Sequence, residues 1–102
     1  MKNAKKIAII GGSQEQTFKK IGRKHGCEIL FHPGSSRAGA KRSELTAMIR
    51  KSDCVVVLLG ACSHRTEEEV KKICKERNVK VCYQQGFGAS GAIQNGLQLL
   101  AS

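Results

Sequence analysis

Two histidines and one cysteine stand where hydrophobic segments of this sequence end, and these residue types could do chemistry together. His32 ends the segment EILFH, and the stretch LLGACSHRTEEE at 58–69 carries Cys62 and His64 just after an apolar run. Imidazole nitrogens and a thiolate are ligands for zinc, copper or iron, and a haem needs only one or two such axial ligands. One hypothesis is therefore a transition-metal or haem site at His32, Cys62 and His64.

The same residues allow a catalytic hypothesis, with His64 as a general acid/base or Cys62 as a nucleophile. The signatures of established enzymes are absent from the sequence, however. Gly11-Gly12-Ser13 lacks the later glycines of a dinucleotide fingerprint, and no P-loop lysine follows it. Because no oriented acid–base partner is visible for His64 or Cys62, the sequence favours a protein that is not an enzyme.

Strand and helix patterns alternate four times along the chain, which is typical of a parallel sheet covered on both faces. Right-handed crossovers then favour a doubly wound sheet. We expect residues 1–102 to form a single α/β domain, a three-layer α/β/α sandwich around a four-stranded parallel sheet of order 2-1-3-4. Its strands are predicted at Lys6–Ile10, Glu28–His32, Cys54–Gly60 and Lys80–Gln84.

Ligands of doubly wound sheets bind beyond the carboxyl ends of the strands, where the strand order reverses. Here that point lies between strands one and three, at the Gly11-Gly12 turn, whose backbone N–H groups could hold an anion. His32 and His64 follow strands that are about 10 Å apart and would flank a ligand over the glycines. We therefore expect a non-enzymatic sensor or carrier of a small anionic ligand. The residues predicted to bind it are Gly11, Gly12, Ser13, His32, Ser35, Arg37, Ser63, His64 and Arg65.

The remaining histidine and cysteines fit structural roles. His25 falls on the apolar stripe of the first helix, where a partly buried position is expected. Four cysteines occupy core positions and should pack as small apolar groups, namely Cys27, Cys54, Cys74 and Cys82. The five cysteines are an odd number without disulfide-framework spacing, so reduced thiols and a cytoplasmic location are expected.

The formal net charge of +10 allows a polyanion partner, and nucleic acid is the less favoured alternative because no recognised binding motif is present. A solvated, lysine-rich surface explains the charge more simply. The longest apolar run, Cys54–Leu59, is too short to span a membrane. The fourth strand should form an exposed sheet edge, which favours a homodimer through that strand or the last helix.

Four stretches carry a resemblance to a known family, namely IAIIGG at 7–12, His32 followed two residues later by Gly34, SDCVVVLL at 52–59, and Ser63-His64 leading into EEEVKKICKERNVKV at 67–81. Over nearly the whole chain, this order of features resembles the bacterial family catalogued as domain of unknown function 2325. The resemblance implies a compact Rossmann-like domain and supplies no established reaction. Family members more often carry Asp or Asn where this chain has Ala61-Cys62, so the resemblance does not extend to Cys62.

Overall fold

Strands and helices alternate in the computed structural model, which describes residues 5–12, 14–32, 42–59, 64–85 and 89–101. The described strands are β1 (Lys5–Ile10), β2 (Cys27–His32), β3 (Cys54–Leu59) and β4 (Lys80–Gln85). The described helices are α1 (Glu15–Lys24), α2 (Arg42–Arg50), α3 (His64–Arg77) and α4 (Ala89–Ala101). Each predicted strand is present, and its ends agree with the prediction to within one residue.

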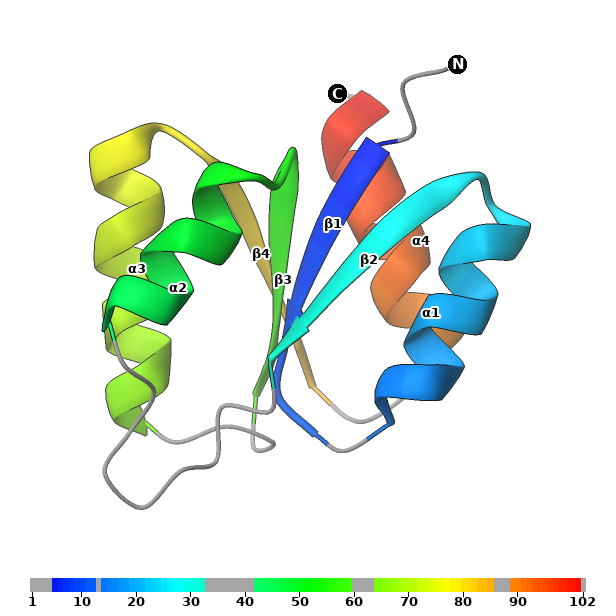
Figure 1. Ribbon diagram of the computed structural model, residues 1–102, viewed down its shortest axis with the longest axis horizontal. Coiled ribbons are helices and arrows are strands. Elements are labelled where there is room, and N and C mark those ends of the chain that lie inside the picture. Colours follow the sequence, from blue (N-terminus) through cyan, green and yellow to red (C-terminus); the bar gives the residue numbers. More distant parts are fainter. Residues whose placement is uncertain (1–4, 13, 33–41, 60–63, 86–88, 102) are drawn as a thin grey trace.

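The four strands form one parallel sheet of order β2-β1-β3-β4, as the sequence predicts. Figure 1 shows this sheet between two layers of helices, with α2 and α3 on one face and α1 and α4 on the other. The order reverses between β1 and β3, so the crevice beyond their carboxyl ends is the place where this class of sheet binds ligands.

Each face of the sheet has its own hydrophobic core. Ile7, Ile9 and Val56 pack with Phe18 and Ile93 in the layer of α1 and α4. The alternate strand residues face the other layer and pack against α2 and α3, and they are Ala8, Ile10, Val55 and Val57. Because the central strands β1 and β3 are buried on both faces, their sequences are nearly continuous apolar runs rather than alternating ones.

The end of α1 corrects one prediction. The helix ends at Lys24, His25 is its C-cap, and Gly26 adopts a left-handed φ of 72°. His25 was expected to be partly buried because its spacing continues the apolar stripe, but the structure leaves it exposed. Helical periodicity does not predict the burial of a C-cap residue, because the backbone leaves the helical path there and the side chain no longer follows the apolar stripe.

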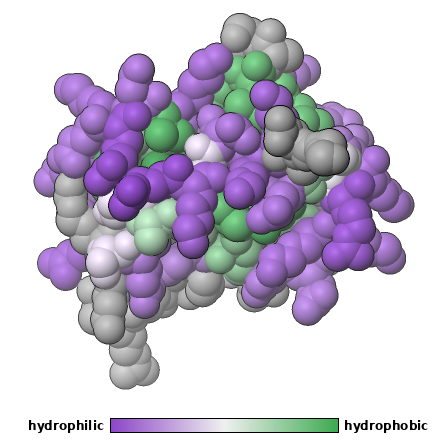
Figure 2. All heavy atoms as spheres, turned by 45° about the horizontal axis from the view of Figure 1, so that its top comes forward, coloured by the Kyte–Doolittle hydropathy of each residue, from purple (hydrophilic) through white to green (hydrophobic). Residues whose placement is uncertain are grey.

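Most of the charge lies on the outer surface of the helices. Figure 2 shows hydrophilic side chains over much of one face, with hydrophobic atoms in patches between them. Lys19, Lys20 and Lys72 are examples of exposed basic residues on α1 and α3. Within the described segments, no helix combines the length and the hydrophobicity that crossing a membrane requires.

Candidate functional site

The glycine turn after β1 is the centre of the predicted site. Gly11 and Gly12 have φ angles of 119° and 88°, a region that side chains with a Cβ rarely adopt. The N–H of Gly11 donates to the carbonyl oxygen of His32 at 2.8 Å, which continues the β1–β2 ladder into the turn. The sheet therefore already uses the Gly11 N–H as a donor, and the role of the Gly11-Gly12 turn in binding an anion stays a prediction.

The amino end of α1 supplies donors that the helix itself does not use. The helix begins at Glu15, and its N-cap residue, Gln14, makes no side-chain capping bond. The first backbone bond of the helix runs from the Phe18 N–H to the Gln14 carbonyl at 3.0 Å. The N–H groups of the preceding first turn have no carbonyl within the helix to bond, and they carry the positive end of the helix dipole. This end, rather than Gly11, is the anion-attracting feature next to the turn.

His32 lies toward the α2 layer. Residues of β2 alternate between the two faces, and Leu30 packs in the core beneath α2 and α3, so His32 shares that face. Its side chain is 17% exposed, and Nε2 lies 3.4 Å from Oε1 of Glu44 in the first turn of α2. Glu44 was not among the predicted site residues, although a helix that follows a strand in a parallel sheet starts at the carboxyl edge. Its place in the first turn of α2 was therefore a usable signal.

His64 and Arg65 open α3, and both are exposed. The His64 side chain is 94% exposed, with Nδ1 3.8 Å from Oε1 of Glu67 one turn along the helix. His64 also borders a shallow hollow of about 240 Å³ whose other walls include Glu67, Glu68 and Lys71. Two carboxylates and a single lysine make this hollow a poor site for an anion. An anionic ligand that contacts His64 would therefore lie outside the hollow.

Several predicted residues lie outside the part of the chain that the structure describes, namely Ser13, Ser35, Arg37, Cys62 and Ser63. Among the described residues, no group of three or more His, Cys, Asp or Glu side chains is close enough together to hold a metal ion. The metal or haem hypothesis combines His32 and His64 with Cys62, which is not described, so it stays a prediction.

The four described cysteines are structural, as expected. Cys27 and Cys54 place their Sγ atoms 3.3 Å and 3.5 Å from the carbonyl oxygens of Gly22 and Gly96. Burial raises the pKa of the Cys54 thiol to about 12, helped by the nearby Cys82, and burial raises that of Cys74 to about 11. A thiol with so high a pKa is protonated at neutral pH, so neither residue is a nucleophile.

The parallel order and the glycine turn at its switch point define a Rossmann-like α/β domain. A de novo designed Rossmann fold protein has the same fold, with a TM-score of 0.58 at 17% sequence identity over 98% of this chain and 100% of that one. The chain belongs to the bacterial family described as "Uncharacterized protein conserved in bacteria (DUF2325)", whose sequence model matches residues 6–100. The resemblance inferred from the sequence is thereby confirmed.

Relatives of similar length occur in two bacterial genera. A UPF0751 protein of Bacillus cereus (strain AH820) is 36% identical over 94 residues, which cover 92% of this chain and 94% of that protein. A UPF0751 protein of Desulfitobacterium hafniense (strain Y51) is 36% identical over 92 residues, which cover 87% of this chain and 89% of the relative. These relatives are similar to the chain over nearly their whole length.

Proposed function

We propose that this protein binds a small anionic ligand at the carboxyl edge of its sheet, next to the Gly11-Gly12 turn, and that it acts as a sensor or carrier rather than an enzyme. The observation that carries the proposal is the uncapped amino end of α1, which lies beside a side-chain-free turn at the point where the strand order reverses. Phosphate or carboxylate groups suit such a helix end, because its N–H groups donate and its dipole favours negative charge.

The surrounding side chains support an anion in this place. Arg65 is exposed at the start of α3, and a guanidinium pairs with phosphate or carboxylate through two parallel donors. The Glu15 carboxylate, which would otherwise oppose an anion near the same helix end, forms an ion pair with Lys19 at 2.8 Å. We include a cytoplasmic location in the proposal, because the four described cysteines are all free thiols.

A substitution at Gln14 tests the proposal. Gln14→Asp puts a carboxylate beside the amino end of α1, where it should raise the free energy of unfolding by about 0.3–1 kcal/mol through the helix dipole. The same charge should weaken the binding of an anion there by roughly fivefold, because it competes for the same donors and dipole. The measurement is a thermal-shift screen with phosphate, nucleoside monophosphates and dicarboxylates, since a specific ligand raises stability by mass action.

Gln14→Asn is the matched control for the charge, because it can cap the same N–H groups without a carboxylate and should weaken ligand binding less than Gln14→Asp does. A more stable Gln14→Asp variant that needs roughly fivefold more ligand for the same thermal shift supports the site. If the ligand stabilises the wild type and both variants equally, the ligand binds elsewhere and the proposal is wrong.

A homodimer belongs to the same proposal, and α4 is the surface we assign to it. The helix segment ASGAIQNGLQLLA contains no charged residue, whereas the other helices all carry exposed or terminal basic groups. Two copies of a chain with a net charge of +10 repel one another least where neither presents lysine or arginine. Sedimentation that gives only the monomer mass at high concentration would rule out this contact.

A further inference from the structure

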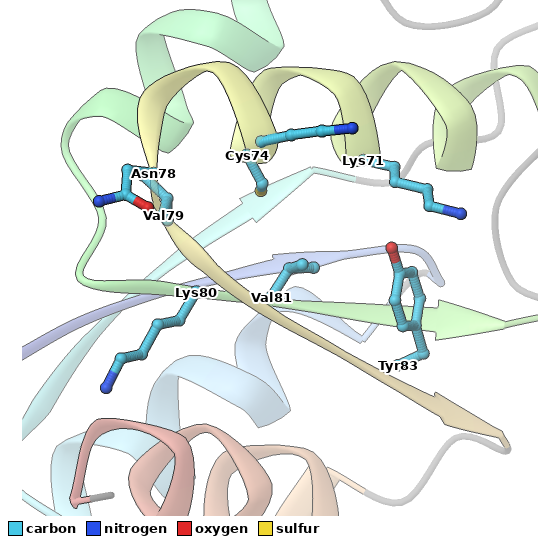
Figure 3. A pocket seen from close by; sticks show the side chains of 8 residues that line it. Lys71, Cys74, Asn78, Val79, Lys80, Val81 and Tyr83 are labelled. Carbon is cyan, nitrogen blue, oxygen red and sulfur yellow. The ribbon is translucent and has the colours of Figure 1, made fainter.

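A groove between α3 and β4 runs along the outer side of the sheet, away from the glycine turn. Its volume is about 480 Å³, and its lining includes Cys74 from α3 and Val79, Val81 and Tyr83 from β4 and the turn before it. Figure 3 shows Val81 and the Tyr83 ring rising from β4 toward α3, with Cys74 pointing down from α3 on the side of Val81 away from Tyr83. The floor of the groove is thus apolar.

One wall of this groove is the last strand of the sheet. The strand order places β4 at an edge, with β3 as its neighbour and no further strand beside it among the described residues. Tyr83 is 41% exposed and is the large hydrophobic residue that the described surface presents most openly. An edge strand beside an apolar groove is the arrangement to which extended peptides add as a further strand, with main-chain bonds on the strand and side chains in the groove.

The charged side chains that line the groove itself are lysines, whereas Glu67 and Glu68 line the neighbouring hollow that shares Lys71 and Tyr83 with it. Lys71 and Lys75 are exposed one turn apart on α3, they border the groove, and none of the residues that line it is acidic. A third lysine, Lys80, is turned to the other side, where its Nζ lies 3.3 Å from the Leu99 carbonyl near the end of α4. Within the groove, an occupant would therefore meet the basic side chains of Lys71 and Lys75.

We propose that this groove binds an acidic, extended segment of a partner protein, which adds to the free edge of β4 as a fifth strand. Its carboxylates lie near Lys71 and Lys75, and its apolar side chains cover Val81 and Tyr83. A second copy of the chain is a poor occupant, because pairing β4 with β4 brings the lysines of both copies together. Single-stranded nucleic acid is disfavoured too, since its binding relies on several stacking aromatics and the lining of this groove has one.

Fluorescence anisotropy with synthetic octapeptides tests the proposal. A fluorescein-labelled peptide of alternating glutamate and valine should bind, and the same peptide with lysine in place of glutamate should not. Two further acidic peptides carry N-methyl groups on the odd or on the even amides. Because a strand pairs through the amides of one edge only, one N-methylated isomer should lose binding at least tenfold, while the other keeps it.

A pair of double variants locates the binding. The double variant Lys71→Gln with Lys75→Gln should bind the acidic peptide about fivefold more weakly, which is the effect expected from the loss of two exposed ion pairs. Lys20→Gln with Lys72→Gln removes the same charge from exposed positions that do not line the groove, and it should leave the affinity unchanged. Circular dichroism confirms that both variants are folded.

Three results would overturn the proposal. The first is an absence of binding of the acidic peptide at millimolar concentration. The second is an equal loss in the two double variants or equal binding of the two N-methylated isomers, since either means that the attraction comes from charge alone. The third is tighter binding of a labelled twelve-residue oligothymidylate that displaces the peptide, which would assign the groove to nucleic acid.

Discussion

Replacement of Phe18 by alanine is expected to lower the free energy of unfolding by about 3–5 kcal/mol, which is the usual cost of truncating a buried phenylalanine. Phe18 is 1% exposed and belongs to the core between the sheet and the α1–α4 layer. Its ring stacks on that of Phe31, with the centroids 5.8 Å apart. The truncation therefore removes apolar contact, an aromatic pair and the main anchor of α1, and the surrounding strands cannot collapse into the space.

Urea denaturation followed by circular dichroism measures this loss. Phe18→Leu is the control, because it keeps most of the buried volume and should cost about 1.5 kcal/mol or less. A domain of this size typically has a stability of 5–15 kcal/mol, so the alanine variant should remain folded but melt at a clearly lower temperature. If alanine costs no more than leucine does, α1 does not pack on the sheet as described.

The fold could be predicted because its signals are local and repeated. The run Cys54–Leu59 is apolar at every position, which is typical of a strand buried on both faces, and the structure places β3 in the centre of the sheet. The ends of helices depend on local signals too, since Asn78 lies just after α3 ends at Arg77 and adopts the left-handed φ of 58° that asparagine tolerates. At the end of α1 the apolar stripe was extended as far as His25, which is the C-cap, and the burial of this residue was predicted wrongly.

The candidate site was less predictable, because strand patterns give the face on which a side chain lies but not the residues of other elements that it contacts there. His32 lies on the α2 side of β2, with its Nε2 3.4 Å from Glu44, and its predicted role beside a ligand over the glycines stays a prediction. His64 was placed correctly at the start of α3, but its side chain is almost wholly exposed. The occupied Gly11 N–H follows from the β1–β2 register, which the sequence does not specify.

The groove beneath α3 had no sequence signal of its own. Tyr83 reads as an ordinary strand residue, and Lys71 and Lys75 read as part of a solvated helix face. Their proximity depends on how α3 lies over β4, and that is decided by the packing of Val70, Ile73 and Cys74 against the sheet. The sequence alone therefore does not predict that these lysines lie beside Tyr83.

Gly22 should be the position on α1 that least tolerates a side chain. A Cβ at Gly22 would overlap Cγ1 of Ile29 and lie 2.8 Å from its Cδ1, and Ile29 is itself 5% exposed. We expect Gly22→Val to lower the free energy of unfolding by about 3 kcal/mol, because overpacking of a filled core typically costs 1–3 kcal/mol and sometimes more. Gly22→Ala should cost about 1 kcal/mol, since its better helix propensity offsets part of the strain.

Gly91→Ala on α4 is the matched control for this effect. The nearest atoms to a Cβ there belong to the amide end of the Gln84 side chain, at 3.3 Å, which accepts a hydrogen bond from Asn95 but can shift more readily than the buried Ile29. The control should therefore leave the free energy of unfolding unchanged or raise it by up to about 1 kcal/mol, the difference in helix propensity between alanine and glycine. If both alanine variants are stabilised, α1 has room above β2 and the close approach at Gly22 is not what holds the helix against the sheet. If only Gly22→Ala lowers the free energy of unfolding, the close approach of α1 to β2 requires a glycine at this position. That approach also determines where the amino end of α1 lies beside the glycine turn.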